Sequence, residues 1–302
     1  QAGLTDALLP LMKAAGQKVH VAKSMDAARA FLRSEDTQGL SGILHLWAID
    51  ASEVNPDASL LASLEVVQVL TQAGGTIKHW FVTKGAQAVT NDDAVLPWQS
   101  QFWGFGRTLQ VEQPEILGGC IDLDPASTDI QKDLNFLVSE LFNPERETEV
   151  AFRQGSRRVA RLTKAGVVEG MRDPLTLDSN ASYLITGGVG ALGLQVAQYL
   201  ASQGACHLVL TGRSGVSTDD QRTVLKALED AGVKVEVVVA DIGNSEDVER
   251  LVASAPHLRG VVHAAGVLDD GMLMQQSSDR FGRVARPKVK GAWNLHQKTQ
   301  DR

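Results

Sequence analysis

The chain is poor in several features that mark large protein classes. Only two of its 302 residues are cysteines, Cys120 and Cys206, and each lies in an apolar, strand-like run. Two thiols so far apart in sequence favour buried cysteines in a reducing compartment, such as the cytoplasm, over a disulfide or a metal site. No apolar run approaches the roughly 18 residues that mark a membrane-spanning helix.

An excess of positive charge is also absent. Lysine and arginine number 29 against 36 acidic residues, so the formal net charge is -7. An acidic chain of this kind is not expected to bind nucleic acid or a membrane surface broadly. The length, with 43% apolar residues, is enough for two domains of ordinary size. Because Gln1 is not an initiator and the pattern at Arg302 is still helical, we expect a piece of a larger polypeptide.

The second half alternates apolar runs with amphipathic ones. Continuous apolar runs between helical segments are typical of strands in a parallel sheet that helices cover on both faces. Strands are predicted at 182–188, 207–213, 234–241 and 258–264, with helices at 191–203, 218–231, 245–255 and about 278–298. Asn244 is a predicted N-cap, and Pro287 is expected to kink the last helix or to begin a new one.

The first half repeats this pattern in a blurred form. Strands are predicted at 18–21, 42–49, 77–83 and 118–123, helices at 5–15, 25–33, 60–73 and 97–111, and a hairpin at 149–162. We therefore expect an α/β protein with two Rossmann-like subdomains. A degenerate, structural one spans 1–164, a linker spans 165–181, and a dinucleotide-binding, doubly wound parallel sheet spans 182–302 and lacks its C-terminal part.

Glycine is concentrated after the first strand of the second half. Gly188, Gly190 and Gly193 match the G-x-G-x-x-G spacing between a predicted strand and a predicted helix. In this context the first glycine permits a tight turn, the second lets backbone approach a phosphate, and the third lets helix pack on strand. The helix N-terminus then supplies free N–H groups. Against the alternative of a turn without ligand, the stretch predicts a pyrophosphate site formed by Thr186, Gly187, Gly188, Val189, Gly190, Ala191, Leu192 and Gly193.

Charged residues follow the next two strands. Where an NAD-binding fold places an acidic residue for the ribose 2′-OH, this chain has Arg213 followed by Ser214. A planar cation suits a 2′-phosphate and favours NADP(H); the alternative is a solvated surface arginine. Asp241, followed by Ile242, could accept a hydrogen bond from the adenine amino group or cap a turn, and both interpretations stay open.

Small residues end the fourth strand. Ala264, Ala265 and Gly266 allow backbone to lie against the nicotinamide side of a cofactor. His263, in an apolar strand, is more typical of a satisfied core residue than of a catalyst.

Taken together, these motifs resemble the ketoreductase domain of a modular type I polyketide synthase, a complex short-chain dehydrogenase/reductase. The resemblance rests on TGGVGALG at 186–193, TGRS at 211–214, Asp241, HAAGVLDD at 263–270 and PKVKGAWNLH at 287–296. In the first half, WGFGR at 103–107 and the segments 113–122 and 151–161 are similar to the structural subdomain of that family.

The resemblance implies a reaction and its partners. NADPH would reduce the β-keto group of an acyl thioester carried by an acyl carrier protein, beside neighbouring domains of a multifunctional synthase. The family uses a Tyr as proton donor, a Ser that holds the ketone oxygen and a Lys that favours the ionised phenol. Lys288 matches that lysine. Lys290, roughly 200° further round a helix, is its rival, and a solvated helix lysine is the alternative for either.

Three further residues, Leu268, Asp269 and Asp270, resemble the motif of B-type ketoreductases, which deliver the D-configured β-hydroxyl. In the family this motif steers the entering thioester arm. The alternative is an ordinary polar loop.

The chain departs from the family in one respect: the catalytic Ser, Tyr and Asn are expected beyond Arg302. Its only tyrosines, Tyr183 and Tyr199, lie on the first strand of the second half and the helix after it, and cannot replace the missing one. We therefore expect this chain alone to be inactive and the edge of its fourth strand to be bare. The alternatives are a non-catalytic, structural ketoreductase-like module and the ketoreductase region of an animal-type fatty acid synthase. The direct linker, with no inserted enoylreductase, favours a polyketide module.

Overall fold

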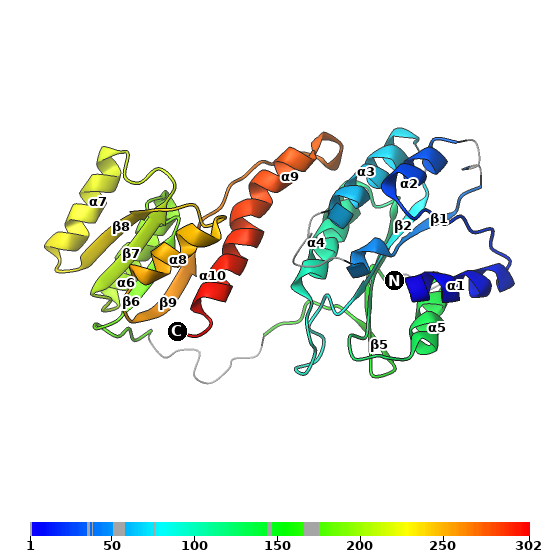
Figure 1. The fold of residues 1–302 in the computed structure, drawn as a ribbon, viewed down its shortest axis with the longest axis horizontal. Coiled ribbons are helices and arrows are strands. Elements are labelled where there is room, and N and C mark those ends of the chain that lie inside the picture. The colour runs from blue at the N-terminus through cyan, green and yellow to red at the C-terminus, as the bar shows by residue number, and fades with distance from the viewer. Residues whose placement is uncertain are drawn as a thin grey trace. The chain divides into compact units, whose positions relative to one another are not determined.

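The computed structural model describes residues 2–34, 37, 39–50, 58–74, 76–143, 147–165 and 175–302, which form two compact units (Figure 1). Unit 1 consists of Gln1–Lys164 with Gly271–Gln276, and unit 2 of Ala165–Asp270 with Ser277–Arg302. Each unit has its own sheet with helices packed on it, as the α/β pattern of the sequence predicts. Most of the predicted linker, at 166–174, lies outside the described residues.

Unit 1 is built on a five-stranded sheet in the order β1-β2-β3-β4-β5. The first four strands are parallel, and β4 and β5 form an antiparallel hairpin that turns at Gln154 and Gly155, both with positive φ. The strands are β1 Gly42–His45, β2 Lys78–Lys84, β3 Leu117–Leu123, β4 Glu149–Arg153 and β5 Ser156–Val159. The helices are α1 Ala2–Ala14, α2 Met25–Leu32, α3 Ala58–Gln72, α4 Pro97–Glu112 and α5 Ile130–Leu141, with 3₁₀-helices at Trp47–Asp50 (η2) and, between β9 and α9 in sequence, Leu273–Gln275 (η3).

Three expectations for unit 1 need correction. The strand predicted at 18–21 is wrong: this segment is irregular, and the ring of His20 stacks on Phe31 of α2 at 3.9 Å. The strand predicted at 42–49 ends at His45, and η2 follows. Helix α5 was not predicted; it begins at an N-cap, Asp129, whose carboxylate accepts the N–H groups of Gln131 and Lys132.

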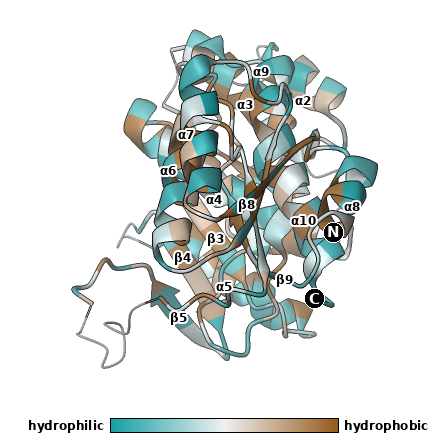
Figure 2. Ribbon diagram, turned by 90° about the vertical axis from the view of Figure 1, so that its left-hand side faces the viewer, coloured by the Kyte–Doolittle hydropathy of each residue, from teal (hydrophilic) through white to brown (hydrophobic). Residues whose placement is uncertain are grey.

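Unit 2 is built on a parallel sheet in the order β8-β7-β6-β9, the four strands that the sequence predicts. They are β6 Ser182–Thr186, β7 His207–Gly212, β8 Lys234–Val239 and β9 Leu258–His263. One described apolar cluster packs under α6 Ala191–Ser202 and α7 Asp219–Asp230, and another under α8 Ser245–Ala253 and Leu295. The sheet is therefore covered on both faces. Figure 2 shows mainly hydrophobic residues, in brown, along strand β8 and mainly hydrophilic residues, in teal, on helix α7.

The outer edge of β9 has no strand partner among the described residues. The strand alternates between half-buried and exposed residues, with Val261 37% exposed. This agrees with the expectation of a bare edge. The carboxyl ends of β6, β7 and β9 lie level, since Thr186 pairs with both Thr211 and His263.

The last helical stretch is continuous but changes its period at Pro287. It consists of α9 Ser278–Ala285, a π-helical segment η4 Arg286–Gly291 and α10 Ala292–Thr299. Proline lacks an N–H and cannot complete the α-helical pattern, and π-segments of one turn accommodate such interruptions. Gly291 then packs closely on Ile242, where a Cβ would lie 2.6 Å from the Ile242 Cδ1.

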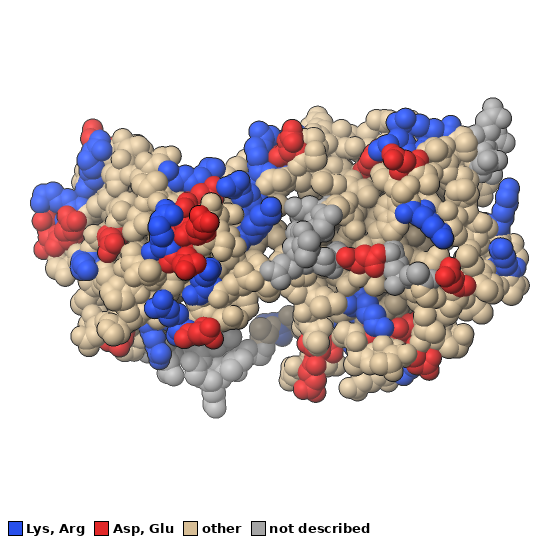
Figure 3. Space-filling view, viewed as in Figure 1, with Lys and Arg blue, Asp and Glu red and all other residues tan. Residues whose placement is uncertain are grey.

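Charges on unit 2 are largely interspersed, and in Figure 3 its basic side chains lie next to acidic ones. Among the ion pairs are Arg250 with Asp247 at 2.9 Å and Lys298 with Glu249 at 2.7 Å. Among the described residues, no helix is both long and apolar enough to cross a bilayer.

Candidate cofactor-binding site

The glycine-rich turn connects β6 to α6 at the carboxyl edge of the sheet. Its left-handed residue is Gly187, with φ of +65°, one position before the glycine that the G-x-G-x-x-G spacing assigns to the tight turn. A Cβ on Gly187 would lie 2.9 Å from the backbone of Ala264. A Cβ on Gly188 would lie 2.6 Å from the Ile185 carbonyl oxygen. Both positions therefore exclude any side chain, the first also by conformation.

The third glycine of the spacing allows the helix to approach the turn. A methyl group on Gly193 would overlap the carbonyl oxygen of Gly187. No side chain caps the first turn of α6, and its N-cap, Gly190, is exposed together with Ala191 and Leu192. The N–H groups of the first turn and the positive end of the helix dipole are thus accessible to solvent. Groups of this kind at a helix N-terminus are suited to binding phosphate.

The loop after β7 presents Arg213 and Ser214 beside this turn. Both residues are exposed, and the described part of the chain supplies no hydrogen-bond or ion-pair partner for Arg213. The loop is held close to the glycine turn, because Gly188 N–H donates to the Thr211 carbonyl at 2.9 Å. A planar cation is thereby available near the glycine turn.

Asp241, after β8, already has two partners. Its Oδ1 accepts the Gly243 N–H at 2.8 Å, which is the turn-capping role that the sequence left open. Its Oδ2 lies 2.9 Å from a guanidinium nitrogen of Arg286 on η4. The neighbouring Ile242 is buried, and its carbonyl accepts the Asn294 side-chain amide. Arg286 was not singled out from the sequence, because nothing there indicates that η4 returns to this strand.

The residues after β9 are tied to β6 and to η4 by one hydrogen-bonded chain. The Ala265 N–H donates to Thr186 Oγ1 at 3.3 Å, and Thr186 Oγ1 lies 2.7 Å from His263 Nδ1. His263 Nε2 lies 3.1 Å from the Pro287 carbonyl oxygen. Since a carbonyl only accepts, His263 carries its proton on Nε2 and accepts the Thr186 hydroxyl on Nδ1. Both ring nitrogens of His263 therefore have hydrogen-bond partners, as the sequence suggested. His263 is nevertheless exposed at the sheet edge and not buried in the core.

Lys288 is the next residue after Pro287, whose carbonyl oxygen ends this series of hydrogen bonds. Its Cε lies 3.7 Å from where a Cβ of Gly266 would be, so its side chain reaches the segment that follows β9. No described residue forms an ion pair or hydrogen bond with its ammonium group. Lys290, the rival, has no described atom within 4 Å of that Gly266 position. The structure therefore brings Lys288, and not Lys290, next to Gly266.

The segment with Leu268, Asp269 and Asp270 is held by α9. Asp269 forms ion pairs with Arg280 at 2.8 Å and with Arg283 at 2.5 Å, and Arg280 also donates to the carbonyl oxygens of Asp269 and Asp270. Leu268 is 78% exposed. The motif is thus a loop with a fixed backbone that leaves Leu268 and the Asp270 side chain accessible.

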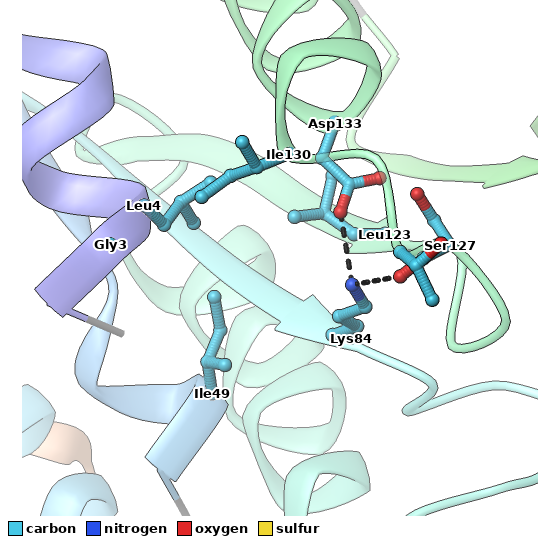
Figure 4. Close-up of a pocket in the computed structure, with 9 residues that line it drawn as sticks. Gly3, Leu4, Ile49, Lys84, Leu123, Ser127, Ile130 and Asp133 are labelled. Carbon is cyan, nitrogen blue, oxygen red and sulfur yellow. Dashed lines mark hydrogen bonds and ion pairs between the residues drawn. The ribbon is translucent and has the colours of Figure 1, made fainter.

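Three other features do not involve these residues. A cavity of about 260 Å³ in unit 1 is lined by Lys84, Asp133, Ser127, Thr128 and apolar residues. Figure 4 shows Lys84 between Asp133, at 3.0 Å, and the Ser127 carbonyl, at 2.8 Å. The cavity contains none of the predicted site residues.

The two cysteines differ in exposure. Cys120 is buried, which raises the pKa of its thiol to about 12, but Cys206 is exposed before β7, contrary to the expectation. No described group of His, Cys, Asp and Glu could hold a metal ion.

Two family models match the chain, one for each unit. Residues 181–302 match the KR domain, and residues 8–162 match the Rossmann fold domain of polyketide synthase extender module SpnB. The second match alone covers more than half of the chain.

Curated relatives and solved structures agree with these matches. The chain is 31% identical over 287 residues to a 6-methylsalicylic acid synthase of Arthrobotrys oligospora and 34% identical over 273 residues to polyketide synthase GfsA of Streptomyces halstedii, with 87% of the chain covered in each case. It spans only 16% and 4% of their lengths. A structure of A-type ketoreductases from a modular polyketide synthase aligns with a TM-score of 0.78 and 31% identity, covering 93% of this chain and 61% of that one. A C2-type ketoreductase aligns with a TM-score of 0.82 and 29% identity, covering 97% and 66%.

The fold and the site define a short-chain dehydrogenase/reductase-like layer joined to a second, degenerate Rossmann layer. The chain belongs to the ketoreductase domains of modular polyketide synthases.

Proposed function

We propose that this chain forms the cofactor-binding part of an NADPH-dependent ketoreductase, which reduces a β-ketoacyl thioester on an acyl carrier protein to a β-hydroxyacyl thioester. The observation that carries the proposal is the cradle of Gly187, Gly188 and Gly193, where no side chain fits, at the open N-terminus of α6. Neighbouring polyketide synthase domains and the carrier protein are its proposed partners.

The residues present fit a dinucleotide. The glycine turn and the start of α6 would hold the pyrophosphate, Arg213 and Ser214 the adenosine 2′-phosphate, and Asp241 with Ile242 the adenine. Ala264, Ala265 and Gly266 would face the nicotinamide half. When bound, the cofactor supplies the hydride. A structural module without cofactor would not need a cradle this closely packed, and we infer a binding role from it.

Lys288 is the proposed catalytic residue of this chain. Its ammonium group would favour the ionised form of a nearby phenol, which otherwise has a pKa near 10. Neither tyrosine of this chain is placed for that task. The Tyr183 hydroxyl accepts the Asp178 N–H at 2.8 Å near the amino end of β6, and Tyr199 lies on α6. We therefore propose that the proton donor comes from sequence beyond Arg302 and that this chain alone does not turn over.

We further propose B-type stereochemistry, from the Leu268, Asp269 and Asp270 motif. The similar structures include A-type and C2-type enzymes, so the overall fold is shared among types and the motif carries this proposal. The loop that Arg280 and Arg283 hold would direct the thioester arm toward one face of the nicotinamide. The configuration of the hydroxyl product made by an extended, active chain tests it: an L-configured product would contradict the motif's assignment.

The test of function is NADPH consumption with a β-ketoacyl thioester, by this chain and by one extended by about 150 residues of its parent sequence, about one further domain's length. We expect turnover only in the longer chain. In that chain Lys288→Met should lower kcat about a hundredfold or more, whereas Lys290→Met, the matched control, should leave it within about twofold. Turnover by the short chain would contradict the proposed mechanism, and inactivity of both would favour a structural module.

A further inference from the structure

Gln221, in the first turn of α7, connects two loops of the candidate site through one side chain. Its Nε2 donates to the carbonyl oxygen of Val189, in the glycine turn, at 2.8 Å. Its Oε1 accepts the N–H groups of Ser217 at 2.7 Å and Thr218 at 2.9 Å, in the loop that begins with Arg213. The Thr218 hydroxyl in turn accepts the Gln221 N–H at 3.2 Å, which completes a capping box.

Only a neutral amide can make this bridge. The Val189 carbonyl requires a donor, whereas the Ser217 and Thr218 N–H groups require an acceptor, and the glutamine side chain offers one of each at its two ends. A capping box by itself needs only the acceptor half of this pattern. The donated bond to Val189, 32 residues away in sequence, is therefore an addition to helix capping that links α7 to the glycine turn.

The middle of the loop between β7 and α7 is held by packing, since Gly215 is buried and Val216 packs on the apolar cluster under α6 and α7, whereas the residues on either side of it point to solvent. These flanking residues, Arg213, Ser214, Ser217 and Thr218, are all exposed. Two further contacts act where the loop leaves the strand: Gly188 N–H donates to the Thr211 carbonyl, and Val189 packs on Gly212, where a Cβ would lie 2.7 Å from the Val189 Cγ2. Gln221 restrains the far end of the same loop.

We propose that Gln221 is a positioning residue for the adenosine 2′-phosphate, an inference that rests on the proposed use of NADPH. By fixing the Arg213 loop against the turn that would hold the pyrophosphate, it sets the distance between the two phosphate-binding elements. The loop is then already ordered before the ligand binds, so binding carries no further entropic cost of ordering it. The 2′-phosphate is therefore held more tightly. The residue touches no phosphate itself, and its effect should be confined to ligands that carry the 2′-phosphate.

The experiment measures binding of adenosine 2′,5′-bisphosphate and of 5′-AMP to this chain by calorimetry. Gln221→Met keeps the length and helix propensity of the side chain but can neither donate nor accept strongly. We expect it to weaken bisphosphate binding about tenfold, the equivalent of one lost hydrogen-bond network, and to change 5′-AMP binding by less than about twofold. Gln221→Asn, one methylene shorter, cannot reach both loops and should behave likewise. Gln198→Met, at an exposed position of α6, is the matched control and should leave both affinities unchanged.

Each outcome decides the proposal. An equal loss of affinity for both ligands would assign Gln221 to the glycine turn or to general stability. Unchanged affinities for both ligands would also overturn the proposal. Thermal unfolding of the variants shows whether they fold, and the Asn variant provides the answer if the Met variant does not. The proposed use of NADPH is tested separately by the wild-type chain: a bisphosphate bound no more tightly than 5′-AMP would refute it and the role of Gln221 together, whereas a preference that Gln221→Met leaves intact would refute only the latter.

Discussion

The Nδ1 atom of His263, at the end of β9, lies 2.7 Å from Oγ1 of the fully buried Thr186, at the end of β6. Because His263 also reaches the Pro287 carbonyl at 3.1 Å, this pair connects the start of the glycine turn to the helical segment that carries Lys288. The two halves of the candidate site, the glycine turn and the proposed catalytic lysine, are thereby connected through the side chains of Thr186 and His263.

Replacing Thr186 tests this connection. Thr186→Val keeps the shape of the side chain but removes the hydroxyl, which leaves the Ala265 N–H and the His263 Nδ1 without their partner. We expect a loss of about 1–3 kcal/mol in the free energy of unfolding, measured with urea. Thr186→Ser keeps the hydroxyl and should lose less. Equal losses in both variants would show that the methyl group matters and not the hydrogen bonds.

The packing of the glycine turn is tested by Gly193→Ala. Because the added methyl group would overlap the Gly187 carbonyl oxygen, we expect both a lower unfolding midpoint and the loss of dinucleotide binding, followed by calorimetry. Gly282→Ala is the control, since the Gly282 position in α9 has open space around it. There alanine should stabilise the helix by about 1 kcal/mol or less. An alanine tolerated at 193 would contradict the close approach of α6.

Two histidines in unit 1 should make the stability of this protein depend on pH. Burial lowers the pKa of His45 to about 3, and burial with the neighbouring His45 lowers the pKa of His79 well below its usual value. The unfolded chain therefore binds protons that the folded chain does not. Stability is full above about pH 6.5 and falls below it, with a slope approaching about 1.4 kcal/mol per pH unit for each histidine.

The variant for this prediction is His79→Phe. Both ring nitrogens of His79 are buried and have no hydrogen-bond partner among the described residues, so an apolar ring should be tolerated and should reduce the slope between about pH 6 and 4. Urea unfolding across that range measures it. His296→Gln, at an exposed position of α10, is the control. A slope unchanged by His79→Phe would assign the acid sensitivity to other groups.

Arg153 stabilises unit 1 from within. Its side chain is 2% exposed and forms ion pairs with Asp93 and Asp122, both at 2.6 Å. Arg153→Met would leave two buried carboxylates without their cation, at a cost of about 3–5 kcal/mol. Arg158→Met, at an exposed position of β5, should cost almost nothing by the same denaturation measurement. A small loss at 153 would show that the two carboxylates are stabilised without it.

The second half of the chain was predictable because its signals are local. Strands β6 and β7 contain continuous, buried apolar runs at 183–185 and 208–210, and the glycine turn and the Asn244 N-cap each depend on only a few neighbouring residues. The first half has weaker signals. The run at 18–21 has strand-forming residues, but none of the described strands pairs with it. Helix α5 depends on its N-cap and on burial of Leu134 and Leu137 in the unit 1 core.

Sequence alone determined the family, the parallel sheet and the types of residue at the site, because backbone conformation at glycines and the periodicity of apolar residues are local properties of the chain. Only the tertiary structure decided which distant residues meet. It placed Lys288 rather than Lys290 over Gly266, paired Asp241 with Arg286 and Asp269 with Arg280, and brought Gln221 to Val189. These contacts join elements far apart in sequence, and their geometry depends on how the helices pack on the sheet and on the π-helical turn at Pro287, which no local pattern specifies.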